Sequence, residues 1–211
     1  IRYNFIDAKL SVIDPWKREG YQRDKLSKEI EDANPDDIII VSDVDEIPNL
    51  AKIDFEKIDN YVYAFSLFHS MYKLNLMRQV MWIGTKLCKK KILKSPQWLR
   101  SLKVHKKYSF LRIDKFFSKT YYSKFKIIEN SGWHFGWLMR SDEIVKKINS
   151  YSHTEHNTPL NNDKIFIEDC IKNEINFLDK NDVLSVNSDI NKLPNYVKNN
   201  PEKFSEWIIK K

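Results

Sequence analysis

The chain has 211 residues, of which 42% are hydrophobic, 13% aromatic and 31% charged, and its formal net charge is +7. This composition excludes the disordered and fibrous classes and fits a single globular domain over residues 1–211. The sequence holds no apolar run of the ~18 residues that a membrane-spanning helix needs, so we expect no transmembrane segment within the chain.

The N-terminal part predicts two short strands, a helix and a further strand. Residues 2–7 and 10–13 have the composition of strands, and residues 16–33 carry apolar side chains at roughly helical intervals. Pro35 disfavours helical geometry in the residue before it and ends this helix. The β-branched run 38–41 is typical of a strand covered on both faces. This order of elements predicts a βαβ-like unit with a partly parallel sheet.

The rest of the chain continues the alternation of strands and helices. Residues 61–68, 81–84 and 125–129 have strand composition. Residues 141–151 read as a helix that Ser141 can cap. Further on, the sequence predicts an amphipathic segment around residues 165–175 and a short apolar stretch near the C-terminus. These elements complete an α/β domain.

The positive charge is spread along the chain, with one dense run of lysines in residues 86–94. This run is either a solvated basic face or a surface that attracts a phosphate-bearing ligand. No zinc-finger spacing or RNA-binding aromatic strand accompanies it, so we expect no nucleic-acid partner. Cys88 and Cys170 lie far apart and outside any CxxC spacing, which argues against a disulfide framework and favours a reducing compartment.

Three carboxylates follow the apolar strand in the stretch DDIIIVSDVDEIP (36–48). Asp43 and Asp45 lie two residues apart, so in a turn both side chains can reach one cation. Hard oxygen ligands of this kind suit Mg²⁺ or Mn²⁺, which take their remaining ligands from water and substrate phosphates. The alternative is that these residues only accept backbone hydrogen bonds in a loop.

The stretch SGWHFGW (131–137) combines two glycines, two tryptophans and a histidine in a chain that has only four glycines. Glycine lets the backbone approach a ligand closely, and indole faces suit the apolar faces of sugar rings. The alternative is a buried strand with bulges, in which His134 is a structural histidine. In the later stretch SYSHTE (150–155), His153 is either a structural residue or a nitrogen ligand for a divalent metal.

Six segments of the chain occur in the order and with the composition of a known family. They are WKREGYQR (16–23), DDIIIVSDVDEIP (36–48), WIGT (82–85), LR (99–100), NSGWHFGW (130–137) and DEIVKKINSYSH (142–153). Together they resemble glycosyltransferase family 17, which includes the β-1,4-mannosyl-glycoprotein N-acetylglucosaminyltransferase that adds bisecting GlcNAc. The resemblance covers about residues 14–157 and leaves residues 158–211 as a C-terminal extension.

The resemblance implies an α/β, GT-A-like nucleotide-sugar transferase fold with a mixed, mostly parallel central sheet. It also implies an inverting, metal-dependent transfer of a sugar, GlcNAc in the first place, from UDP-GlcNAc to a glycan or other hydroxyl acceptor. Asp43 and Asp45 would then hold Mn²⁺ or Mg²⁺ on the donor diphosphate. His153 lies where many enzymes of this fold place a third metal ligand.

An inverting enzyme also needs a carboxylate that takes the proton of the acceptor hydroxyl. In the resemblance this base is Glu143, with Asp142 beside it, at the start of the helix after the aromatic segment. Both residues could instead be acids of a helix's first turn that complement its dipole. Glu46 and Glu155 are rival bases, and Glu46 is also a candidate for donor or acceptor binding.

The remaining binding residues follow from the same resemblance. Arg18 and Arg23, on the helix before the metal-binding strand, could contact phosphate. Arg23 could instead pair with Glu19 one helical turn earlier. Trp133, His134 and Trp137 are the candidates for lining the sugar or acceptor site.

One feature departs from the family. Its members begin with a further β-α-β segment that carries much of the nucleoside pocket, and the sequence shows no counterpart of it. An inactive or binding-only module derived from a transferase is therefore an alternative to the enzyme. A phosphatase of the haloacid-dehalogenase type, which also places DxD after an apolar strand, is disfavoured because Glu46, Ile47 and Pro48 follow the second aspartate. We expect a cytoplasmic bacterial or viral enzyme, or a Golgi enzyme if an anchor lies outside this chain.

Overall fold

The computed structural model describes residues 14–103, 122 and 124–210. In chain order its elements are α1 (Pro15–Lys25), η1 (Leu26–Ile30), β1 (Ile38–Val41), β2 (Glu46–Pro48), η2 (Leu50–Lys52), η3 (Phe55–Lys57), β3 (Val62–Met71), β4 (Leu76–Met77), β5 (Trp82–Lys89), η4 (Lys90–Ile92), α2 (Pro96–Ser101), β6 (Phe125–Ile128), β7 (Gly132–Trp137), α3 (Ser141–Ser150), η6 (Thr154–His156), α4 (Lys164–Lys172), β8 (Ile175–Asn176), β9 (Asp179–Val183), β10 (Ser185–Val186), η7 (Ile190–Lys192), α5 (Asn195–Lys198) and η8 (Pro201–Trp207). The strands predicted at residues 2–7 and 10–13 lie outside the described residues.

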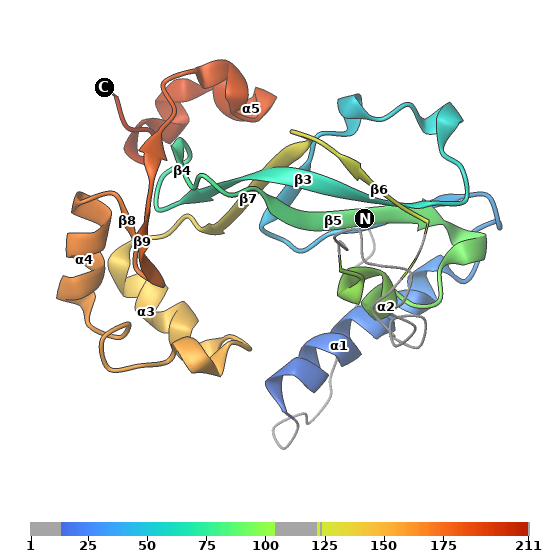
Figure 1. Cartoon of the computed structure of the whole chain (residues 1–211), viewed down its shortest axis with the longest axis horizontal. Coiled ribbons are helices and arrows are strands. Elements are labelled where there is room, and N and C mark those ends of the chain that lie inside the picture. Colours follow the sequence, from blue (N-terminus) through green and yellow to red (C-terminus); the bar gives the residue numbers. More distant parts are fainter. Residues whose placement is uncertain (1–13, 104–121, 123, 211) are drawn as a thin grey trace, which may run out of the picture.

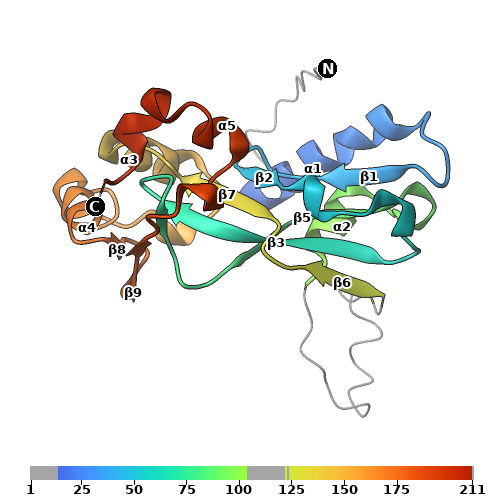
Figure 2. The ribbon, with the colours of Figure 1, turned by 90° about the horizontal axis from the view of Figure 1, so that it is seen from above.

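A curled, mixed sheet of eight strands crosses the molecule (Figure 1). Its central strand is β3, which pairs with β4, β5, β6 and β7 and is buried at nine of its ten residues. Strand β3 runs the length of the sheet, with β6 beside one end and β7 beside the other (Figure 2). This position explains why the segment YVYAFSLF reads so clearly as a buried strand.

The prediction of a mostly parallel sheet is wrong. Within the described residues, five of the seven strand pairs of the main sheet are antiparallel, and β6 and β7 run parallel to β3. Strand β1 pairs with β5 alone among the described strands and ends the order β1-β5-β3-β4-β10, so Ile38, Ile39 and Ile40 are half-buried and not covered on both faces. A β-branched run predicts a strand but does not fix its partner or direction.

The helices gather under the two ends of the sheet. Helices α1 and α2 lie near one end, and α3 and α4 lie near the other (Figure 1). Leu99 of α2 packs with Val62 of the central strand, whereas Ile144 and Ile148 of α3 pack with Ile167 of α4 in a separate cluster. Helices thus form where the sequence predicts them at residues 141–151 and 165–175, although α4 ends at Lys172 and strand β8 takes Ile175. The helix predicted over residues 16–33 is shorter than expected: α1 ends at Lys25 and a 3-10 helix continues only to Ile30, so Pro35 does not end it.

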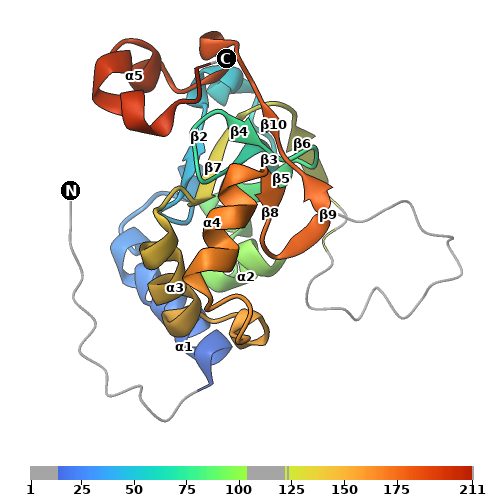
Figure 3. The ribbon, with the colours of Figure 1, turned by 90° about the vertical axis from the view of Figure 1, so that its left-hand side faces the viewer.

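The C-terminal residues pack back onto the sheet. Leu193 and Val197 are buried against Leu74 and Met77, next to β4. Viewed from its side, the molecule shows α5 on the face opposite α1 (Figure 3). In the ranges that the structure describes, no helix combines the length and apolar character needed to cross a membrane.

Candidate functional site

A cavity of about 620 Å³ brings together most of the side chains that the sequence singles out. Its walls come from α1, the β1–β2 turn, strands β3, β5, β7 and β8, helix α3 and the segment after α3. The lining residues are Glu19, Gln22, Arg23, Asp43, Val44, Asp45, His69, Met71, Arg78, Trp82, His134, Gly136, Trp137, Lys147, Tyr151, Ser152, His153, His156, Asn176 and Leu178. The cavity therefore lies between the helices that gather at the two ends of the sheet.

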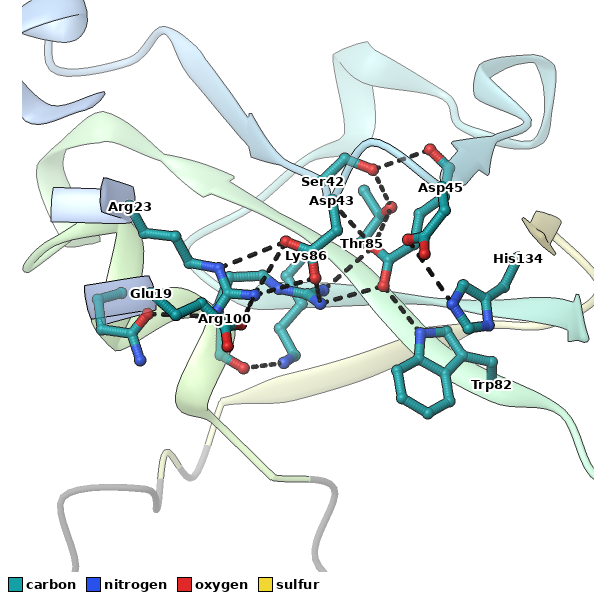
Figure 4. Close-up of polar contacts among 12 residues, drawn as sticks. Glu19, Arg23, Ser42, Asp43, Asp45, Trp82, Thr85, Lys86, Arg100 and His134 are labelled. Atoms are coloured by element: carbon teal, nitrogen blue, oxygen red, sulfur yellow. Dashed lines mark hydrogen bonds and ion pairs between the residues drawn. The ribbon is translucent and has the colours of Figure 1, made fainter. Parts of the chain in front are cut away.

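Asp43 and Asp45 lie in the turn that connects β1 to β2, at the wall of this cavity. Arg23 Nη2 lies 3.0 Å from both carboxylate oxygens of Asp43, and Arg100 contacts the same carboxylate (Figure 4). Asp45 is held less closely, with Lys147 Nζ at 3.6 Å and His134 Nε2 at 3.7 Å. Protein cations thus offset the repulsion between the two carboxylates.

Glu46 lies beneath the two aspartates, and its side chain is completely buried. Its carboxylate accepts hydrogen bonds from Trp82 Nε1 at 2.8 Å and Thr85 Oγ1 at 3.0 Å, and from both terminal nitrogens of Arg100. A buried carboxylate that is paired and fully hydrogen-bonded is a structural support. Glu46 does not line the cavity, so it positions the turn instead of meeting a ligand there.

Gly84 in the WIGT segment is required by this buried carboxylate. A Cβ atom at position 84 would lie 2.5 Å from Glu46 Oε1 and 2.8 Å from Trp82 Cδ1. Side-chain atoms do not tolerate such distances, so any larger residue would displace the Glu46 carboxylate or the Trp82 ring. The glycine therefore leaves space for the hydrogen-bonded side chains of Glu46 and Trp82.

Two buried histidines and a tryptophan form a layered wall. The rings of Trp82 and His134 stack at 4.5 Å with 14° between their planes, and His69 lies 4.5 Å from His134 on centroids. Burial lowers the pKa of His69 to about 3, and burial also lowers the pKa of His134 although nearby Asp45 opposes this. Both imidazoles are therefore neutral at neutral pH.

The neighbours of His69 decide which of its nitrogens carries the proton. Arg78 Nη1 lies 3.3 Å from His69 Nδ1, and a guanidinium can only donate. We therefore assign the proton to His69 Nε2, which has no hydrogen-bond partner among the residues that the structure describes. Arg78 itself is held by Asp182, which also accepts a hydrogen bond from Asn176. The hairpin of β8 and β9 thus holds Arg78 in place at this end of the cavity.

The structure brings together six of the residues that the sequence predicts for the site. The six that line the cavity are Arg23, Asp43, Asp45, His134, Trp137 and His153. Three other candidates, Arg18, Glu46 and Trp133, do not line it. Trp133 instead donates a hydrogen bond from Nε1 to the carbonyl oxygen of Lys192 at 2.6 Å, because alternate residues of β7 point to opposite faces of the sheet.

Asp142 and Glu143 lie at the start of α3, outside the lining of the cavity. Arg140, and not Ser141 as predicted, occupies the cap position of this helix. Glu143 Oε2 accepts a hydrogen bond from the backbone N–H of Arg140 at 2.9 Å, and Asp142 lies 3.6 Å from Lys146. These are the contacts of first-turn acids, which is the alternative that the sequence left open.

Several residues in the lining of the cavity or beneath it were given no role from the sequence. Trp82, Arg100 and Lys147 fall inside the segments WIGT, LR and DEIVKKINSYSH, so the segments pointed to them without naming their chemistry. Lys147 donates a hydrogen bond to Gly136 O and lies over the ring of Trp137 at 4.8 Å. His69 lies within a continuous apolar strand, where nothing in the sequence distinguishes a site residue from a core residue.

The donor set at Asp43 and Asp45 fits a hard divalent cation. Their side chains are 32% and 30% exposed, and carboxylate oxygens are the ligands that Mn²⁺ and Mg²⁺ prefer. A cation there would compete with Arg23 and Arg100 at Asp43 and with Lys147 near Asp45. His153 lines the same cavity, but its ring gathers with Glu155 and His156 and not with the two aspartates.

Comparison with known proteins gives one match. The model of glycosyltransferase family 17 matches residues 1–207, which extends the resemblance of residues 14–157 in both directions. Searches of curated proteins and of solved structures found no match. The matched range contains the whole cavity, including its C-terminal residues Asn176 and Leu178.

Proposed function

The chain belongs to glycosyltransferase family 17, and from this premise we propose that it transfers GlcNAc from UDP-GlcNAc to a hydroxyl group of a glycan, with Mn²⁺ or Mg²⁺ as cofactor. The observation that carries the proposal is the composition of the cavity. Two carboxylates, Asp43 and Asp45, share one wall with the cations Arg23 and Lys147, and aromatic rings form the wall beside them. A charged nucleotide and a sugar need these two kinds of surface.

The charged end of the cavity suits the diphosphate of the donor. Asp43 and Asp45 would hold the cation. When bound, the cation would offset the negative charge that develops on the diphosphate of the leaving UDP. Arg23, which also pairs with Glu19 as the sequence allowed, and Lys147 would then be released from Asp43 and Asp45 and could pair with phosphate oxygens. Guanidinium groups bind phosphate through two parallel hydrogen bonds, which fixes the orientation of the ligand.

The aromatic side of the cavity suits the sugar. Trp82 and Trp137 line it with their rings, and sugar rings stack their apolar faces on indoles. His134 lies between the Trp82 ring and the carboxylate of Asp45, where the sugar and the diphosphate would meet. We further propose an inverting transfer, in which a carboxylate takes the proton of the acceptor hydroxyl.

Calorimetric titration of UDP-GlcNAc into the full chain, with and without Mn²⁺, tests the proposal. We expect binding that requires Mn²⁺, loss of this binding in Asp45→Asn, and unchanged binding in Asp36→Asn, an exposed aspartate that pairs with Lys89 and Lys91 and does not line the cavity. Binding that ignores Mn²⁺, or that survives in Asp45→Asn, would contradict the metal assignment. Binding without release of UDP in the presence of glycan acceptors would instead support the binding-only alternative.

A further inference from the structure

Three side chains that can bind a metal ion meet just after helix α3. His153, Glu155 and His156 each offer one ligand atom, and these atoms all lie within 4.8 Å of one another. Over residues 14–103, 122 and 124–210 they form the one such group of three. The group is separate from Asp43 and Asp45, although His153 and His156 line the same cavity.

The local backbone explains why these side chains converge. His153 caps the 3-10 helix η6, and the backbone N–H of His156 donates to His153 O at 3.1 Å. In a 3-10 helix, side chains three residues apart eclipse one another, so both imidazoles project from the same side. Their ring centroids are 5.6 Å apart with 30° between the planes, and Glu155 Oε1 lies 2.6 Å from His153 Nδ1.

Aromatic neighbours hold both imidazoles in place. The Trp16 ring meets His153 edge-on at 4.4 Å, and the Tyr151 ring lies nearly parallel to His156 at 6.2 Å. In the described part of the chain, the ring nitrogens of His156 make no hydrogen bond or ion pair. The two imidazoles are thus oriented by packing, while the nitrogens of His156 remain available to a ligand.

We infer that His153, Glu155 and His156 form a second metal site of the type that binds Zn²⁺. Two imidazole nitrogens and one carboxylate oxygen are the protein ligands of zinc sites that keep a fourth position for water. Mn²⁺ and Mg²⁺ prefer sets made of oxygen, so this site differs in selectivity from the pair of aspartates. The side chains of His153 and Glu155 are 45% and 57% exposed, which leaves them room to close onto bonds of ~2.1 Å.

Zinc at this position would stabilise one wall of the cavity. The segment that carries the three ligands touches the start of α1, where Ser152 Oγ donates to Pro15 O at 3.4 Å and Trp16 packs on His153. Joining His153, which precedes η6, to Glu155 and His156 within it through one ion would restrict the motion of this segment. This inference does not depend on the proposed donor or acceptor.

Titration of ZnCl₂ into the metal-free full chain, followed by calorimetry and by the thermal unfolding midpoint, tests the inference. We expect one Zn²⁺ per chain and a raised midpoint in the parent protein and in Asp45→Asn, and at least about tenfold weaker binding without a raised midpoint in His156→Ala. His156 is half-buried, so this variant should fold, and its circular dichroism spectrum checks that it does.

The other outcomes would overturn the inference. Absence of Zn²⁺ binding in the parent protein would show that the three side chains do not close on an ion. Loss of binding in Asp45→Asn with retention in His156→Ala would place the zinc at the aspartates. Because UDP-GlcNAc is absent from these titrations, a failure of the proposed transferase function leaves their result unaffected.

Discussion

Glu46 and Arg100 form an ion pair beneath the cavity, in which Arg100 Nη2 lies 3.0 Å from Glu46 Oε1. The two side chains are 0% and 9% exposed, so neither charge is solvated to a large extent. The same guanidinium also contacts Asp43. Arg100 therefore connects the buried carboxylate of Glu46 to the carboxylate that faces the cavity. Removing one partner would leave the other charge buried without compensation.

We predict that Arg100→Ala lowers the free energy of unfolding by about 3–5 kcal/mol, because it leaves the Glu46 carboxylate buried and unpaired. Urea unfolding measures the change. Arg18→Ala, at a partly exposed arginine of α1 outside the cavity lining, is the matched control and should change stability by less than ~1 kcal/mol. A similar, small effect for both variants would show that Arg100 does not compensate the buried carboxylate.

We predict that Lys147→Gln binds Mn²⁺ at least about threefold more tightly than the parent in the absence of donor, because it removes an ammonium group 3.6 Å from Asp45 Oδ2. Titration of Mn²⁺, followed by calorimetry, measures the affinity. Lys146→Gln is the control, since Lys146 is 79% exposed and lies near Asp142 on the outside of the helix. Weaker Mn²⁺ binding in Lys147→Gln would argue against Asp45 as a metal ligand.

The sequence predicted the elements of the fold better than their pairing. Periodicity and composition located β1, β3, β6, α1 and α3, because burial of one face of a helix or strand leaves a local pattern. The sequence did not predict the antiparallel pairing of β1 with β5, because β5 lies about fifty residues later and no local signal records that contact. Parallel pairing of β7 with β3 likewise arises from the tertiary fold alone.

The sequence located one half of the site and missed the other. Asp43 and Asp45 were identifiable because two carboxylates after an apolar strand stand out against their surroundings. Lys147 and Arg100 were not, since lysine and arginine on helices are ordinary surface residues until the fold turns them toward a carboxylate. Burial of His69 depends on neighbours from two other strands, Trp82 of β5 and His134 of β7, which a linear pattern does not contain.

We predict that Glu143→Gln keeps sugar transfer within about threefold of the parent, because Glu143 accepts a backbone hydrogen bond and glutamine retains that acceptor. Glu143→Ala should lower the free energy of unfolding by about 1 kcal/mol, since it removes the contact at the start of α3. Initial rates of UDP release and urea unfolding measure the two effects. A loss of more than about a hundredfold in Glu143→Gln, with donor affinity retained, would restore the role of general base that the sequence suggested.

We predict that the protein loses stability as the pH falls below the ordinary pKa of histidine, and that His69 is one source of this loss. Burial lowers the pKa of His69 to about 3 in the folded state, so between pH 6.5 and pH 3 the unfolded chain binds a proton that the folded protein excludes. The sign is therefore a falling free energy of unfolding with falling pH, amounting to about 2 kcal/mol from this group between pH 7 and pH 5. Urea unfolding at both pH values measures the difference, which should shrink by a similar amount in His69→Gln. An unchanged difference in that variant would show that another group causes the pH dependence.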